Sequence, residues 1–327
     1  MLAFIGKRLI YMAITLWVIS IVTFIIIQLP PGDYLTTLVA TMSERGDSIS
    51  MEQIAALKTR YGLDRPLYVQ YFVWFKGILH GDFGWSFEWG KPVKDLLWGR
   101  IGLTLTVTVF SLLFTWAVAF PIGIYSAVKQ YSPGDYIATL FGFAGMAIPN
   151  FLLALILMWI GFRYFGINVG GLFSPEYMDA AWSWGRFVDL LQHIWIPMIV
   201  VGLSSTATLI RTMRANLLDE LNKPYVVTGR AKGMQERELI LKYPVRIALN
   251  PFISTLGWSL PTLISGEMIS SVVLNLPTTG PLFLRALQSQ DMYLAGSFVI
   301  ILSSLTVIGT LLSDIVLAWV DPRIRYE

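Results

Sequence analysis

The chain has 327 residues, of which 55% are hydrophobic and 14% are charged, with 12 Trp and no Cys. Globular proteins average about 25% charged residues, so this chain carries apolar and aromatic surface that a water-soluble fold cannot easily hide. The absence of Cys excludes disulfides, thiolate metal sites and cysteine catalysis, and the hydrophobicity excludes disorder. The net charge of +3 is too small to indicate a nucleic-acid partner. Composition therefore predicts a membrane protein.

Six stretches along the chain are apolar over the roughly 20 residues that a bilayer-spanning helix needs. They are residues 9–29, 102–128, 136–162, 190–210, 248–276 and 292–320. The first is too long for a cleavable signal peptide, so we interpret it as a retained span. The alternation of a membrane β-barrel is absent. We therefore predict an all-α, polytopic membrane bundle of six helices.

The distribution of Lys and Arg predicts the orientation of the bundle. Segments 1–8, 129–135, 211–247 and 321–327 together hold 13 of the 24 basic residues, although the remaining connections are about twice as long. Basic residues concentrate in cytoplasmic connections. Both termini are therefore expected in the cytoplasm, in agreement with an even number of spans.

Two connections are too long to be simple turns, and they divide the chain into 1–29, 30–101 and 102–327. In the predicted external segment 30–101, the sequence Ser50-Met-Glu-Gln53 is typical of a capping box, which predicts a short helix through Arg60. The aromatic density of residues 69–79 favours a folded segment over a floppy hairpin.

The predicted cytoplasmic loop 211–247 is the second long connection. Pro224 suits the first turn of a helix that continues through 225–232, and Gly233 stands where a left-handed residue would end it. Residues 234–243 predict a second short helix that stops at Pro244. Two basic helices around a glycine indicate either a docking element for a protein or a loop that faces lipid headgroups.

Missing motifs exclude several functions. The sequence contains no G-x-x-x-x-G-K-S/T phosphate loop, no H-E-x-x-H and no G-x-S-x-G, so we expect neither phosphate-loop ATP hydrolysis nor metalloprotease or serine hydrolase activity. His193 is expected at a helix end near the membrane interface. Only Glu267 and Asp314 are ionisable within the later spans, which gives little support to an ion-coupled secondary transporter. Glu267 is either the wall of a translocation path or a structural hydrogen-bonding group.

The strongest motif lies in the loop 211–247. Its sequence Tyr225-Val-Val-Thr-Gly-Arg-Ala-Lys-Gly233 resembles Y-V-x-T-A-R-A-K-G, the coupling motif of permease subunits of bacterial ABC importers, in the B-type dipeptide/oligopeptide family. Gly229 replaces the usual Ala of that motif. The resemblance implies type I importer topology and a coupling loop that docks on an ATPase subunit. The residues that it assigns to this contact are Tyr225, Thr228, Gly229, Arg230, Ala231, Lys232 and Gly233.

Further matches extend along almost the whole chain. Residues 29–33 resemble L-x-P-G-D, residues 81–84 match G-D-x-G, and residues 321–323 match D-P-R. Tyr34 departs from the Pro usual after P-G-D, and Ser271 stands where peptide members usually carry Glu. Since the family also contains oligosaccharide importers, the cargo stays open between peptides and oligosaccharides.

The resemblance also implies partners in the bacterial inner membrane. They are a second homologous permease subunit, one or two ATPase subunits that bind ATP and Mg²⁺, and a periplasmic substrate-binding protein, with no cofactor on this chain. We expect a translocation path at Glu267, Ser271 and Pro261. Docking of the binding protein is expected at Asp33, Gln53 and Asp82.

Overall fold

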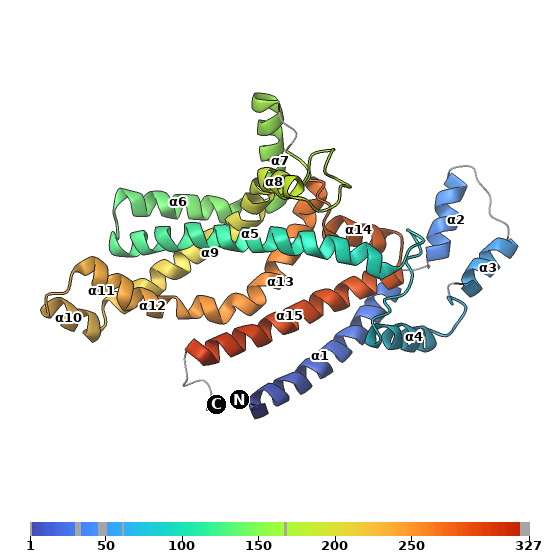
Figure 1. Ribbon diagram of the computed structural model, residues 1–327, viewed down its shortest axis with the longest axis horizontal. Helices are drawn as coiled ribbons and strands as arrows, with labels where there is room; N and C mark the ends of the chain where they lie inside the picture. The colour runs from blue at the N-terminus through green and yellow to red at the C-terminus, as the bar shows by residue number, and fades with distance from the viewer. Residues whose placement is uncertain (1, 30–33, 45–50, 61, 167–168, 321–327) are drawn as a thin grey trace. The chain divides into compact units, whose positions relative to one another are not determined.

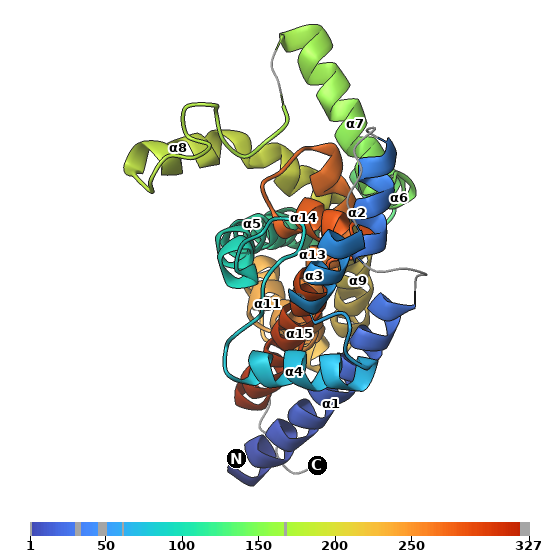
Figure 2. The ribbon, with the colours of Figure 1, turned by 90° about the vertical axis from the view of Figure 1, so that its right-hand side faces the viewer.

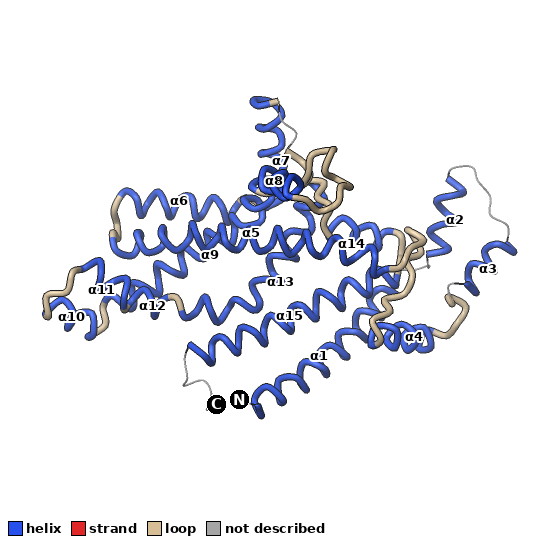
Figure 3. Tube along the Cα trace, in the orientation of Figure 1, coloured by secondary structure: helices blue, strands red, loops and turns tan. Residues whose placement is uncertain are grey.

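The computed structural model describes residues 2–29, 34–44, 51–60, 62–166 and 169–320. Within these ranges the regular structure is helical, and one isolated bridge joins Trp85 to Pro92 (Figure 3). The predicted all-α class is therefore confirmed. The helices, which Figure 1 labels except for η1, are α1 (Leu2–Gln28), α2 (Tyr34–Glu44), α3 (Met51–Arg60), α4 (Leu67–Leu79), α5 (Val93–Val128), α6 (Pro133–Ala147), α7 (Asn150–Ile160), the π-helix η1 (Gly161–Phe165), α8 (Trp184–His193), α9 (Trp195–Leu221), α10 (Pro224–Ala231), α11 (Glu236–Lys242), α12 (Pro244–Ala248), α13 (Asn250–Val273), α14 (Thr279–Gln288) and α15 (Met292–Val320).

Several of these helices are long and apolar enough to cross a membrane. Four do so individually in the described part of the chain, at Gly6–Gln28, Val93–Val128, Trp195–Leu221 and Met292–Leu311, and the bent pair formed by α6 with α7 and η1 makes a fifth. The fifth predicted span, 248–276, coincides with α13, of which Thr262–Val273 is a shorter apolar helix. The count of six and the cytoplasmic termini stay predictions.

The third predicted span, 136–162, is broken near its middle. The axes on the two sides of the break differ by 102°. Ile148 has an extended backbone with φ −87° and ψ 117°, and Pro149 follows it. Proline lacks an N–H and pushes the preceding residue out of the helical region, so the helix stops and restarts here.

The fourth span also begins later than the apolar pattern suggests. Residues from Trp184 to His193 form a separate helix, α8, and the span starts at Trp195. The ring Nδ1 of His193 lies 2.8 Å from the backbone oxygen of Asp189. His193 therefore ends a helix, as predicted.

The contacts divide the chain into two compact units, and the first comprises Met1–Leu103 with Thr278–Ile308. In this unit α4 packs on α1, as Figure 2 shows. The predicted folded state of segment 30–101 is confirmed in its described part, because α2 contacts α3 and two apolar clusters form. One cluster contains Phe24, Tyr71, Trp74, Met292 and Ile300, and the other contains Tyr34, Leu35 and Phe87.

The second unit comprises Thr104–Pro277 with Gly309–Glu327, and α9 is its central helix. Helices α6, α7, α12 and α13 all contact α9. A buried cluster joins α9 to the end of the loop 211–247 and to α13, through Met213, Leu217, Ile240, Val245 and Phe252. The division of the chain at residues 29 and 101 describes position relative to the membrane and stays a prediction.

Candidate functional site

Within the loop 211–247 the two predicted short helices form, as α10 and α11. The predicted loop bounds are wrong, because residues 211–221 continue α9 and Pro244 begins α12 instead of ending the helical structure. Pro224 occupies the first turn of α10, where a missing N–H is harmless. At its other end Gly233 has φ +75°. The N–H of Gly233 donates to Arg230 O at 3.0 Å, and the N–H of Met234 donates to Gly229 O at 3.2 Å. This pair of bonds is a Schellman motif, which needs a left-handed residue and so favours glycine.

Gly229 makes the close approach of α10 and α11 possible. A Cβ atom at this position would lie 2.5 Å from Cδ1 of Leu239, which is buried on α11. Glycine in a helix interior costs roughly 1 kcal/mol relative to alanine. The tight packing of the two short helices accounts for the departure from the Ala that the coupling motif usually carries.

The outer face of α10 is exposed. Thr228, Arg230, Ala231, Lys232 and Gly233 are all solvent-accessible, and the Thr228 hydroxyl donates to Pro224 O at 2.9 Å. The buried face holds Val226 and Gly229. The loop therefore presents a mixed basic and polar surface while its underside is fixed to the second unit.

An ion pair connects α10 to α11 across the glycine turn. Arg230 Nη2 lies 2.7 Å from Glu236 Oε1, and Arg230 Nε lies 3.1 Å from Glu236 Oε2. These hydrogen bonds lower the pKa of Glu236 and raise the pKa of Arg230. Both side chains are about half exposed, so the pair stabilises the loop by less than about 1 kcal/mol. Its main effect is to fix the orientation of α10 relative to α11.

A second polar contact joins α10 to the end of α9. The Tyr225 hydroxyl donates to Glu220 Oε2 at 2.7 Å. Burial, and then the hydrogen-bonded carboxylate, raise the pKa of Tyr225. Tyr225 therefore links α10 to α9 and leaves the exposed residues of the loop available for contact.

Asp135 and Arg214 form an ion pair that sequence reasoning missed. Arg214 Nε and Nη2 donate to the two carboxylate oxygens of Asp135 at 3.0 and 2.9 Å, and the Tyr131 N–H also donates to this carboxylate at 3.0 Å. The carboxylate is buried. The pair joins the start of α6 to α9, and no local pattern connects residues 79 positions apart.

A cavity of about 440 Å³ opens beside α9 in the second unit. Hydroxyl side chains of Ser204, Ser205, Thr208 and Thr212 line it together with apolar groups that include Trp116 and Phe252. The hydroxyls of Thr208 and Thr212 donate to the carbonyls of Ser204 and Thr208, which leaves their acceptor lone pairs for another group. Ser204, Thr208 and Thr212 recur every four residues on one helical face, a signal readable in the sequence.

The residues predicted for a translocation path lie elsewhere on α13. Glu267 and Ser271 are buried, and the Ser271 hydroxyl donates to Met268 O at 2.7 Å. The side chain of Pro261 lies outside the described residues. From α13, Thr262 and Leu263 line the cavity beside α9. A role of Glu267, Ser271 and Pro261 in a path stays a prediction.

Of the residues predicted to contact a binding protein, one has a described side chain. Asp82 is exposed, and its Oδ1 accepts from the Gly84 N–H at 2.9 Å. Asp33 lies outside the described residues, as does the side chain of Gln53, whose backbone belongs to α3.

The chain matches known proteins along its whole length. Residues 119–326 match the family described as "Binding-protein-dependent transport system inner membrane component", and residues 1–108 match its N-terminal domain family. The chain is 33% identical to the oligopeptide transport system permease protein AppB of Bacillus subtilis over 327 residues, with 100% of both chains covered. It is 30% identical to the dipeptide transport system permease protein DppB of Escherichia coli K12 and 30% identical to the oligopeptide transport system permease protein OppB of Haemophilus influenzae, again with 100% of each chain covered.

The chain therefore belongs to the family of inner-membrane permease components of binding-protein-dependent transport systems. It is a permease subunit of an ABC importer in the bacterial inner membrane, and a substrate-binding protein and an ATPase are its partners in transport. Within such an importer the chain provides membrane passage and is no catalytic subunit.

Proposed function

We propose that this permease subunit moves short peptides inward across the membrane as one half of a heterodimeric channel. Its relatives from three bacteria are named for transport of oligopeptides or dipeptides, and they align with the whole chain. These names favour peptides over oligosaccharides as the cargo. In this proposal the second half of the channel is a homologous permease subunit, and the termini lie in the cytoplasm.

The coupling loop 211–247 is the proposed contact with the ATPases. ATP and Mg²⁺ bind to those partner subunits, and their closure pushes on the exposed face of α10 at Thr228, Arg230, Ala231 and Lys232. A ligand shifts a conformational equilibrium only through different contacts in the two states. The exposed face of α10 provides such contacts.

One observation carries the proposal: α9 holds the coupling loop at one end and lines the cavity along its length. Ile240 and Val245 of the loop share a buried cluster with Met213 and Leu217 of α9. Further along α9, Ser204, Thr208 and Thr212 face the cavity. Closely packed interiors transmit small displacements. A push on α10 would therefore move the wall of a path for solute.

The cavity suits a peptide backbone because it combines hydroxyl oxygens with an apolar wall. Acceptors on Thr208 and Thr212 can receive N–H groups of any peptide, and Trp116 and Phe252 accept side chains of varied shape. Glu267, Ser271 and Pro261 would line a deeper part of the path. Asp33 and Gln53 would contact the binding protein on the external side. Asp82 would either join this contact or serve the lipid site proposed below, and the experiment described there separates the two roles.

Replacing Gly233 by proline in the complete importer tests the coupling role. Proline fixes φ near −65° and removes the N–H that Gly233 donates to Arg230 O, so the Schellman motif cannot form. We expect the complex to assemble and to lose its ATPase stimulation by loaded binding protein. Normal stimulation would refute the role of the loop.

Gly166→Pro is the matched control. Gly166 also has a positive φ, +64°, donates its N–H to a helix carbonyl, and has open space where a Cβ would lie. It follows η1 and lies far along the chain from the coupling loop. We expect this variant to keep both assembly and stimulation, which separates loss of coupling from general backbone strain.

A second experiment identifies the ATPase and the cargo. Pull-down through the coupling loop should recover a subunit with a phosphate-loop motif, and recovery of none would refute the importer mechanism. A thermal-shift screen of the cognate binding protein should show stabilisation by peptides. Stabilisation by oligosaccharides alone would show that oligosaccharides, and not peptides, are the cargo. The proposed permease mechanism would be unaffected.

A further inference from the structure

Helix α4 lies against a part of α1 that belongs to a candidate membrane span. The hydroxyls of Ser20 and Tyr71 lie 2.9 Å apart, and the ring of Phe24 lies 5.4 Å from that of Tyr71 and 6.0 Å from that of Trp74. The span of α1 ends at Gln28. With a rise of 1.5 Å per residue, Phe24 and Ser20 are roughly 6 and 12 Å inside that end. Helix α4 therefore lies beside the outer part of this span, and its contacts with α1 extend from near the headgroups into the level of the acyl chains.

The face of α4 that points away from α1 is largely apolar. Tyr68, Phe72, Val73 and Leu79 are exposed there together with Lys76. Aromatic rings at the interface and a basic side chain that reaches toward phosphate are typical of a helix lying in the plane of the membrane surface. The position of α4 beside a candidate span and the composition of its exposed face are both those of a face that lipid covers.

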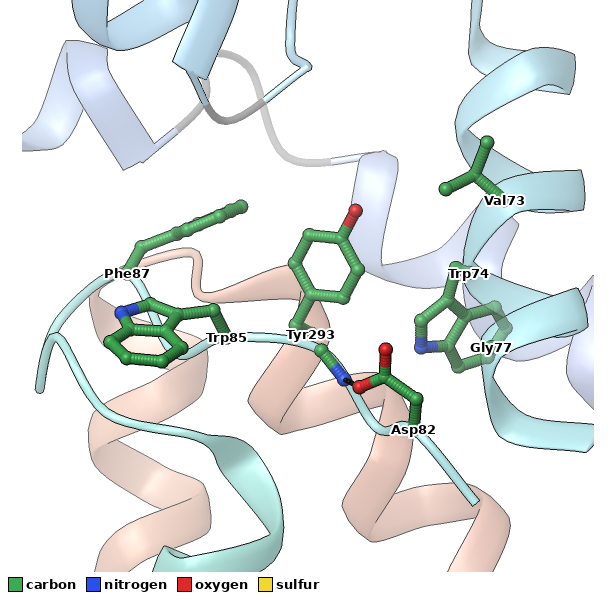
Figure 4. Close-up of a pocket in the computed structure, with 8 residues that line it drawn as sticks. Val73, Trp74, Gly77, Asp82, Trp85, Phe87 and Tyr293 are labelled. Carbon is green, nitrogen blue, oxygen red and sulfur yellow. Dashed lines mark hydrogen bonds between the residues drawn. The ribbon is translucent and has the colours of Figure 1, made fainter. Parts of the chain in front are cut away.

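A pocket of about 200 Å³ opens beside this face (Figure 4). Val73 belongs both to the exposed face of α4 and to the pocket lining, so the two surfaces are continuous. Tyr293 stands at the start of the span of α15, which places the pocket at the end of a second span as well. The pocket is therefore at the boundary between lipid and water.

Two glycines shape the pocket. A Cβ on Gly84, which has φ +79°, would lie 2.4 Å from the Tyr293 ring, and a Cβ on Gly77 would lie 2.8 Å from the backbone oxygen of Asp82. Side chains at these positions would force the lining apart. The glycines bring α4, the segment after it and the start of α15 close enough to enclose one small group.

Beside the Tyr293 hydroxyl and the Trp85 indole N–H, the pocket has a carboxylate acceptor and a buried donor. Asp82 presents an exposed carboxylate. The Trp74 side chain is 2% exposed, and its Nε1–H has no hydrogen-bond partner among the described residues. Figure 4 shows this nitrogen on the side of the indole that faces Asp82. A buried donor without a partner costs about 1–3 kcal/mol, so a ligand that supplies an acceptor would recover that free energy.

Aromatic rings form the remaining wall. Trp85, Phe87 and Tyr293 line the pocket opposite Trp74, and the Phe87 and Tyr293 rings meet edge to face with centroids 5.3 Å apart (Figure 4). Ring faces beside a carboxylate attract an ammonium group by cation–π interaction and by charge.

We propose that this pocket binds the headgroup of an amine-bearing phospholipid of the phosphatidylethanolamine class. The ammonium group lies against Asp82 and the aromatic wall, and a phosphate or ester oxygen accepts the Trp74 Nε1–H. The acyl chains run along the exposed face of α4. An anionic headgroup without an amine, such as phosphoglycerol, offers Asp82 no cation and binds more weakly. This site depends neither on the cargo nor on the ATPases.

Native mass spectrometry of the full importer tests the proposal. The complex is taken from nanodiscs that contain phosphatidylethanolamine and phosphatidylglycerol in equal amounts, and the retained lipids are counted. We expect the wild type to retain phosphatidylethanolamine preferentially. Asp82→Asn removes the charge and should lower this preference about tenfold, the effect of one charge-assisted hydrogen bond. Trp74→Phe keeps a ring and removes the donor, and should lower retention about threefold.

Asp64→Asn is the matched control, because Asp64 is an exposed carboxylate of the same segment that does not line the pocket. It should keep the wild-type preference. Equal retention of both lipids by the wild type, or an unchanged preference in both pocket variants, would overturn the proposal. If Asp82→Asn weakened docking of the binding protein and left lipid preference unchanged, the carboxylate would belong to a protein contact and the lipid site would be refuted. Transport and ATPase coupling are measured separately, so their failure leaves this result intact.

Discussion

Single residues decide how closely the coupling loop packs, and Gly229 is the clearest case. Its missing Cβ leaves the space that Leu239 fills, and Leu239 belongs to α11 while Gly229 belongs to α10. The fit between these two residues therefore depends on the missing side chain at Gly229. A change on either side should be compensated by a change on the other.

Gly229→Ala tests this fit. The added methyl overpacks the contact with Leu239 by about 1–3 kcal/mol, and the better helix propensity of Ala returns about 1 kcal/mol. We expect a net loss of roughly 1 kcal/mol, measured as faster hydrogen exchange of the α11 amides. Gly99→Ala is the control, since a Cβ on Gly99 in α5 meets open space. Adding Leu239→Val should restore protection, and slower exchange in the single variant would contradict the packing argument.

At the scale of elements, Asp291 fixes the segment before α5 to the start of α15. Its Oδ2 accepts from the Ser86 hydroxyl at 2.5 Å and from the Glu88 N–H at 3.2 Å, while its Oδ1 accepts from the Leu294 N–H at 3.2 Å. The side chain is completely buried. Burial raises the pKa of Asp291, although these hydrogen bonds oppose the shift.

The direction of this shift sets the pH dependence. Because the folded state holds the proton of Asp291 more tightly than the unfolded state, its contribution to stability falls as pH rises from the unfolded pKa, about 3.9, through the folded pKa. Asp291→Asn places an amide N–H₂ toward N–H and O–H donors, so we expect the free energy of unfolding to fall by about 1–3 kcal/mol. The advantage of the wild type over this variant should be largest in acid and should decrease toward neutral pH.

Limited proteolysis of residues 81–92 between pH 4 and 8 measures this difference. Asp95→Asn is the control, because Asp95 is an exposed carboxylate in the first turn of α5. If the stability of the wild type relative to Asp291→Asn increased with pH, the folded state would not favour the protonated form of Asp291. Equal proteolysis of all three proteins would show that Asp291 does not hold the segment.

At the scale of the whole molecule, the membrane spans are separable from the segment that we propose to contact the binding protein. A deletion within residues 44–60 removes part of α2 and α3, which lie outside every candidate span. Membrane insertion depends on the hydropathy of the spans, so it should survive. We expect weaker binding of the loaded binding protein to the assembled importer, and unchanged affinity would contradict a docking role. Recovery of the ATPase subunits in the same preparation is the control for assembly.

Local features could be predicted from the sequence because their causes are local. The left-handed Gly233, the helix end at His193 and the short helix ending at Arg60 all depend on residues within one or two turns. The bend between α6 and α7 has a local cause in Pro149, yet prolines occur within continuous helices too, such as Pro121 in α5. The sequence alone therefore did not show which proline bends the chain and which lies within a continuous helix.

Contacts between distant residues could not be predicted in the same way. Asp135 meets Arg214 across 79 positions, and Ser86 meets Asp291 across 205 positions. Neither pair has a spacing that one helix or one turn would impose. Only part of the cavity beside α9 could be predicted from the sequence. The hydroxyl row of Ser204, Thr208 and Thr212 has a regular spacing, but the opposing aromatic rings come from other helices.

The sequence by itself determined that this protein is a helical membrane protein with a coupling motif, since hydropathy and short-range backbone preferences act along the chain. Only the tertiary structure decided which charges are paired, where α9 borders a cavity, and that a carboxylate, a buried indole N–H and three aromatic rings share one pocket at the membrane boundary. These features depend on the packing of helices whose residues are far apart in the chain, and packing is set by the fit of many side chains at once.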